Sequence, residues 1–257
     1  MKTQIFLSGK RTTALLIGLA LLSAVSGCGK TSQINDSAAV PANAPVSDSG
    51  TDAPADSSAD SEADSNTDAN GDTSIHVVAV GDNLVQQCVY QSAQAHSQDG
   101  TSYNFDYCYD NIKPLINGDL NIINQETLIC GDGFEVSGSN FNFNSPTELG
   151  DAVVGMGFNV ITMCNNHLLD KGESGLNSCL NYWDQKMQQY PDLLTCGVYR
   201  DYVDMQNIRT KEFNGKTVAF LSYTENTNGY SLPDNSELEI IYTSQEDLIQ
   251  QQIACGN

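Results

Sequence analysis

Short apolar runs recur along the chain from about residue 74 and predict β-strands. Each run is β-branched or apolar and is bounded by glycine or polar residues, as strands of a buried sheet are. The four runs are "IHVVAVG" (75–81), "DLNIINQE" (119–126), "FNVITM" (158–163) and "LLTCG" (193–197).

The segments between these runs have the spacing of helices. Residues 175–190 repeat apolar side chains at helical intervals, which predicts a helix with one core face. A second helix is expected over 145–157, with Ser145 as N-cap and Glu148 closing a capping box. A short helix is predicted over 109–118.

Strands that alternate with helices indicate an α/β fold, a layered and mostly parallel sheet flanked by helices. Asn214-Gly215 lies between two strand-like runs in 208–223, a strong hairpin signal. The last segment, 243–257, begins like a capped helix and no strand follows it. We therefore expect the domain at 74–257 to be incomplete at its C-terminus.

The first 28 residues have the pattern of a secretory signal peptide. Basic residues precede the apolar run "ALLIGLALLSAV", which is too short to span a bilayer comfortably. The end of this segment, "VSGC", resembles the lipobox of bacterial lipoproteins. That resemblance implies that Cys28 is lipidated and anchors the protein outside the cytoplasm, on the cell membrane. The alternative is an ordinary cleaved signal with an incidental cysteine.

Residues 29–73 predict a disordered acidic linker, because they lack aromatic residues and contain few large apolar ones. Acidic residues also exceed basic ones overall, and the net charge is −21. Phosphate binding depends on Lys and Arg, so this charge argues against a nucleic-acid partner. Seven cysteines follow Cys28 and form no CxxC pair, so most are expected to be small buried side chains.

Polar side chains follow three of the predicted strands. Asp82, Glu126 and the run Asn165-Asn166-His167 are the first strongly polar positions after their apolar runs. Ligands of open α/β sheets bind at the carboxyl ends of the strands, so these side chains are expected to converge there. Taken singly, each has an ordinary explanation as a helix cap, a surface acid or a turn residue. Their recurrence at one sheet edge favours a cation site with oxygen and nitrogen ligands.

These residues resemble the capsule-synthesis protein CapA family, which is associated with poly-γ-glutamate and related to calcineurin-like metallophosphoesterases. The resemblance covers about residues 75 to 230 and depends on four stretches: "VVAVGD", "DLNIINQE", "GFNVITMCNNHLLDKGESGL" and "NGKTVAFLSYT". It implies that Asp82, Glu126 and Asn166 ligate two divalent ions of Mn, Fe, Mg or Zn. It also implies that His167 does acid or electrostatic work beside them, with Asp170 fixing its imidazole.

The resemblance has one gap. Family members carry further histidine motifs on late loops, and this chain has no histidine after His167. The chain is therefore expected to be a fragment, or the site to be incomplete; His76 and His96 are expected to be structural or solvated.

Two functions follow from these observations. The first is a metal-dependent, phosphoesterase-like hydrolase of capsule or envelope polymer, if those late motifs exist. The alternative is a non-catalytic lipoprotein that binds such a polymer or a capsule synthase. A solute-binding lipoprotein is disfavoured because no second lobe is visible in the sequence.

Overall fold

The structure is a computed structural model and describes residues 2–8, 74–139, 142–213 and 215–255. Most of the predicted signal peptide, Cys28 and the acidic linker lie outside these residues, and so do the predictions made for them. Within the described part of the chain, no helix has the length and apolar character needed to cross a membrane.

A four-stranded parallel sheet forms the centre of the domain. The strands lie in sequence order, each paired with the next: β2 (Val77–Asp82), β3 (Leu120–Asn124), β6 (Val160–Thr162) and β7 (Leu194–Cys196). All residues of β3 and β6 are buried, as expected for central strands covered on both faces, whereas β2 is an edge strand with alternating exposure. The four predicted strands are therefore confirmed.

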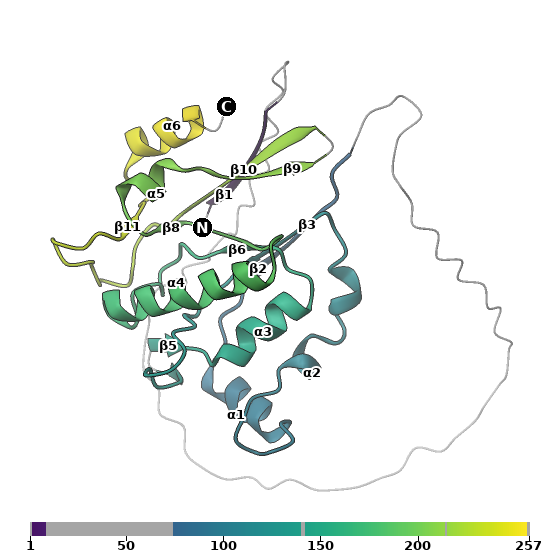
Figure 1. The fold of residues 1–257 in the computed structure, drawn as a ribbon. Coiled ribbons are helices and arrows are strands. Elements are labelled where there is room, and N and C mark those ends of the chain that lie inside the picture. The colour runs from purple at the N-terminus through teal and green to yellow at the C-terminus, as the bar shows by residue number, and fades with distance from the viewer. Residues whose placement is uncertain (1, 9–73, 140–141, 214, 256–257) are drawn as a thin grey trace, which may run out of the picture. The chain divides into compact units, whose positions relative to one another are not determined.

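Two helices cover one face of this sheet (Figure 1). They are α3 (Thr147–Gly155) and α4 (Gly172–Gln189), which connect successive parallel strands. Crossovers between parallel strands are right-handed, so strands added in one direction place their helices on the same face. Val153 of α3 and Trp183 of α4, both fully buried, belong to one core cluster with Ile123 and Ile161 of the sheet.

The opposite face is covered by a second sheet rather than directly by helices. Its hairpin strands are β9 (Arg209–Phe213) and β10 (Lys216–Tyr223), and β1 (Lys2–Ser8) pairs antiparallel with β10. Val218 and Phe220 of β10 pack in one cluster with Leu120 and Ile122 of β3. The hairpin predicted within 208–223 is confirmed by the antiparallel pairing of β9 with β10, and its apolar face packs sheet on sheet.

Further helices pack on the outer face of this hairpin layer. Leu221 and Tyr223, on the other face of β10, form a cluster with Met205 of α5 (Tyr202–Gln206), and Leu248 of α6 (Glu246–Cys255) packs against it. Close by, β8 (Val198–Tyr199) pairs with β11 (Glu239–Ile240). The α/β class, with a mostly parallel sheet flanked by helices, is confirmed, and the hairpin layer is an addition to it.

The remaining elements lie along the connection from β2 to α3. They are α1 (Gln87–Ala95), α2 (Asp106–Tyr109), the 3₁₀ helix η1 (Lys113–Leu115) and the hairpin of β4 (Ser137–Ser139) with β5 (Asn142–Asn144). Buried Tyr90 and Phe105 share a cluster with Leu149 of α3, which holds this region against the helical layer.

Two local predictions were wrong. The helix over 109–118 is reduced to the single turn of η1, because Pro114 cannot donate the backbone hydrogen bond that an α-helix requires. The capping box at α3 does not form, since the helix starts at Thr147 with no side-chain cap bond. The hydroxyl of Ser145 instead lies 2.6 Å from Oγ1 of Thr127, a tertiary partner.

Candidate metal and acid-base site

The candidate site lies where β2, β3 and β6 end. The backbone register aligns Asp82 with Asn124, and Asn124 with Thr162, so the three strands finish at the same edge of the sheet. Glu126 follows β3 by two residues and His167 follows β6 by five. The topology thus places the predicted side chains where α/β sheets bind ligands.

The two carboxyl groups of the site are neighbours with different surroundings. Asp82 is exposed, and its Oδ1 accepts a 2.7 Å hydrogen bond from Asn124 Nδ2. Glu126 is buried, and this burial raises its pKa to about 7. The charge of Asp82 raises that pKa further. At neutral pH this pair is therefore poised to take up a proton or another cation.

Asn165 shapes the turn that presents the histidine. Its Oδ1 accepts a 2.9 Å hydrogen bond from the backbone N–H of His167, and its Nδ2 donates to the carbonyls of Met163 and Gln125 at 3.0 and 3.2 Å. The amide is buried and bonded at both ends. Asn165 therefore has a structural role, as an Asx-type turn residue.

His167 is buried and held on three sides. Its Nδ1 lies 2.9 Å from Asp170 Oδ2, and its Nε2 lies 3.9 Å from Glu126 Oε1. The ring also makes an edge contact with Phe143, at 4.8 Å between centroids and an interplanar angle of 87°. Because a carboxylate accepts and cannot donate, Asp170 favours the tautomer with the proton on Nδ1. The Nε2 lone pair then lies on the side of Glu126.

Asp170 is fixed by the backbone of β5. Its Oδ2 accepts a 2.8 Å hydrogen bond from the N–H of Phe143, while its Oδ1 is buried and has no hydrogen-bond partner. Burial raises the pKa of Asp170, and the bonds from Phe143 and His167 oppose that rise. Asp170 thus contacts both the imidazole and the backbone of β5.

Asn166 contacts Asn228, a residue that the sequence analysis did not single out. Its Nδ2 donates a 3.2 Å hydrogen bond to Oδ1 of Asn228, which follows β10, and Asn228 Nδ2 lies 3.3 Å from His167 Nδ1. Asn166 is partly exposed, and its Oδ1 is not engaged in this bond.

Sequence reasoning also missed a second group of amides beside Asp82. Asn83 Nδ2 donates to Gln125 Oε1 at 2.8 Å, and the Tyr109 hydroxyl donates to Asn83 Oδ1 at 3.0 Å. Asn124 belongs to this group through its bond to Asp82. In the sequence, these amides could have been identified only as polar residues next to Asp82 and Glu126, at positions 83, 124 and 125 of the same strand ends.

The donor set suits a hard divalent cation, but it is small. Two carboxylates with one amide oxygen resemble the few protein ligands that Mg²⁺ and similar ions use, with water completing the sphere. Among the residues that the structure describes, no group of three or more His, Cys, Asp or Glu is arranged to hold a metal. Asp82, Glu126 and Asn166 offer oxygen donors of the kind that a hard cation takes.

The other candidate ligands lie outside the site. Cys164 is fully buried, its Sγ 3.8 Å from the carbonyl of Ile241, and burial raises the pKa of its thiol. Cys130, Cys179 and Cys196 are buried as well, as expected for small apolar side chains. His76 and His96 are exposed, and His96 stacks on Tyr107.

Comparison with known proteins identifies the family of this chain. The profile of the family described as "Bacterial capsule synthesis protein PGA_cap" matches residues 76–253. The chain is also similar to "Capsule biosynthesis protein CapA" of Bacillus anthracis, with 26% identity over 127 residues. That alignment covers 48% of this chain and 30% of the relative, so the chain spans about a third of the relative's length. The family match includes the whole candidate site, and the chain belongs to the PGA_cap family of bacterial capsule synthesis proteins.

Proposed function

We propose that this protein acts in the synthesis of capsule, of poly-γ-glutamate or of a related envelope polymer, through a divalent-cation site formed by Asp82, Glu126 and Asn166. The single observation that carries this proposal is the pairing of the two carboxyl groups beside His167. Glu126 is buried, its pKa is raised by that burial and by the charge of neighbouring Asp82, and its Oε1 lies 3.9 Å from Nε2 of the imidazole. Like charges at such short range are relieved by a bound cation or by a proton.

A divalent ion at this position would polarise a phosphoryl oxygen and lower the pKa of bound water. The chain's own residues would do the rest. Asp82 is exposed and leaves the site open to a substrate from solvent. His167, with Nδ1–H bonded to Asp170, presents Nε2 beside Glu126, where it can hold or release a proton.

The proposal places the domain outside the cytoplasm. Its support is the sequence of residues 1–28, which resembles a lipoprotein signal ending in Cys28, and the acidic composition of 29–73. Cleavage of that signal would remove β1 and leave β10 paired with β9 alone. A lipid anchor followed by a charged linker would hold the domain away from the membrane surface, near the polymer or a capsule synthase.

The test is a titration of the purified full chain with Mn²⁺, together with hydrolysis of bis(p-nitrophenyl) phosphate. We expect wild type to bind Mn²⁺ and Glu126→Gln to bind it far more weakly. The matched control is Asp119→Asn, which removes an acid from the opposite end of β3 and can still accept the 2.8 Å bond from the N–H of His76. Equal Mn²⁺ binding by all three proteins would contradict the site.

A second candidate function is binding of polymer or synthase without catalysis. It is favoured by the small donor set, since the described residues include no group of three His, Cys, Asp or Glu able to hold a metal. The two functions separate in cells. If His167→Ala leaves capsule production intact while deletion of residues 74–257 abolishes it, the binding function is correct.

A further inference from the structure

The loop after β10 has a defined conformation at the edge of the candidate site. Asn228 has φ 53°, and no other non-glycine residue in the described ranges has a positive φ. Its backbone N–H donates to Asn226 Oδ1 at 3.0 Å, and Thr227 Oγ1 donates to the carbonyl of Tyr230 at 2.6 Å. The left-handed backbone is thus held by local hydrogen bonds on both sides of Asn228.

The side chain of Asn228 joins two functional candidates that are about sixty positions away in sequence. Its Oδ1 accepts from Asn166 Nδ2 at 3.2 Å, and its Nδ2 lies 3.3 Å from Nδ1 of His167. An Asn in a tight turn before glycine is common and by itself indicates only a turn. The hydrogen bond from Asn166 is what links this turn to the site, because Nδ1–H of His167 already donates to Asp170 and cannot accept from Asn228 Nδ2.

The contact with Asn166 determines which end of that amide is available. Because Nδ2 of Asn166 is engaged by Asn228, Oδ1 is the atom left for another partner. A hard cation binds amide oxygens and not amide nitrogens. We propose that Asn228 is a positioning residue that orients Asn166 for a divalent cation; this inference rests on the proposed cation site.

Packing in the core does not account for the left-handed backbone of Asn228. The residue is exposed, so its side chain adds little to the core. A left-handed backbone at a non-glycine residue is also unfavourable, although Asn tolerates it better than most. Conformations of this kind persist where neighbouring contacts support them, which here are the local hydrogen bonds of the loop and the bond from Asn166.

Asn228→Gly is the informative substitution, since glycine adopts positive φ without strain and removes only the side-chain contacts. The probe is Mn²⁺, titrated calorimetrically into the full chain. Residues that orient metal ligands typically contribute 10- to 100-fold to metal affinity, so we expect Asn228→Gly to weaken binding about 10-fold. Asn228→Asp keeps an oxygen that can accept from Asn166 Nδ2 and should stay within about 3-fold of wild type.

A double substitution distinguishes positioning from a general effect of the loop. In an Asn166→Ala background, Asn228→Gly should weaken Mn²⁺ binding by less than about 2-fold, because the residue it orients is gone. If the two effects multiply, or if Asn228→Gly binds Mn²⁺ like wild type, Asn228 does not act through Asn166 and the inference is wrong.

A measurement without metal separates this inference from the cation site. In ¹⁵N-edited spectra of the metal-free chain, the side-chain NH₂ signals of Asn166 should shift, and their exchange with water should accelerate, in Asn228→Gly. If wild type binds no Mn²⁺ but these signals change, the cation site is wrong and the orienting contact is real. If the signals do not change, the contact is absent and the inference is overturned.

Discussion

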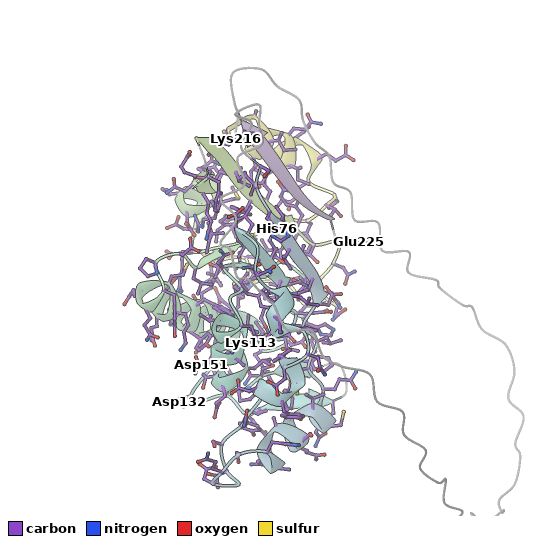
Figure 2. All side chains as sticks on the ribbon, turned by 90° about the vertical axis from the view of Figure 1, so that its right-hand side faces the viewer. His76, Lys113, Asp132, Asp151, Lys216 and Glu225 are labelled. Atoms are coloured by element: carbon purple, nitrogen blue, oxygen red, sulfur yellow. The ribbon has the colours of Figure 1, made fainter. Side chains whose placement is uncertain are left out.

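Two acid-rich regions of this chain differ in how their carboxyl groups are held. At the sheet edge, Glu126 and Asp170 are buried and are linked through His167. In the cleft between α2, η1 and α3, the acids line an opening of about 340 Å³, and Asp106, Asp110 and Asp151 are exposed. Asp151 and Lys113, both labelled in Figure 2, line this cleft, and Asp151 forms an ion pair with Lys186.

The difference shows that the number of acids is a poor guide to chemistry. Exposed carboxylates are stabilised by water and interact weakly with one another. Buried carboxyl groups have altered proton affinity: burial, followed by the charge of Asp82, raises the pKa of Glu126. A cation would therefore gain most at the sheet edge, and substitutions in the two regions should differ sharply.

The largest expected effect is on metal affinity. Asp82→Ala should weaken Mn²⁺ binding on the order of 100-fold, because it removes one of two charged ligands. Asp82 is exposed, so the variant should fold normally. Calorimetric titration measures the change, and a loss of less than about 3-fold would argue against Asp82 as a ligand.

The second largest effect is expected on the free energy of unfolding, when the buried acid Asp170 is substituted. Asp170→Ala removes the acceptor for the N–H of Phe143 and for His167, and should lower the free energy of unfolding by about 2 kcal/mol. Asp170→Asn retains an oxygen that can accept both bonds and should cost about half as much or less. Urea denaturation of the two variants checks this, and equal losses would show that charge matters more than these bonds.

The pH dependence of stability is the third contrast. Glu126 has an ordinary value of 4.5 and a pKa raised to about 7 in the fold, so the folded metal-free protein binds more protons between these values. Stability should therefore fall as pH rises from 5 to 7.5, by about 2 kcal/mol from this group. Glu126→Gln should reduce the dependence of the free energy of unfolding on pH in this range. If the variant shows the same dependence as wild type, other groups cause it.

The smallest effect is expected in the cleft. Asp110→Asn removes an exposed carboxylate and should change both Mn²⁺ affinity and stability very little, by less than about 2-fold and 0.5 kcal/mol. A loss of Mn²⁺ binding comparable to that of Asp82→Ala would place the cation in the cleft and reverse the comparison.

The sequence predicted those parts of the molecule that depend on local pattern and parallel topology. Apolar runs located β2, β3, β6 and β7, and strand ends that meet at one edge located Asp82, Glu126 and His167. The first inference works because neighbouring residues in sequence determine a strand. The second works because parallel strands end at the same edge of their sheet.

Tertiary partners determine what the sequence did not predict. The hydroxyl of Ser145 looked like a helix cap but bonds Thr127 instead. The sequence indicated the β9–β10 hairpin but not its position between the parallel sheet and the outer helices. That position depends on β10 packing apolar side chains on both of its faces. Asn228 lies about sixty residues beyond His167, and no pattern in the sequence connects them.

The most direct measurement of the central claim uses the three histidines of the chain. Mn²⁺ broadens proton signals of nearby groups, and His167 lies next to the proposed ligands, while His76 and His96 are exposed and outside the site. In a titration of the full chain with sub-stoichiometric Mn²⁺, against Mg²⁺ as a diamagnetic control, the ring signals of His167 should broaden first. Broadening of His76 or His96 before His167, or of all three together, would contradict a cation site at this edge of the sheet.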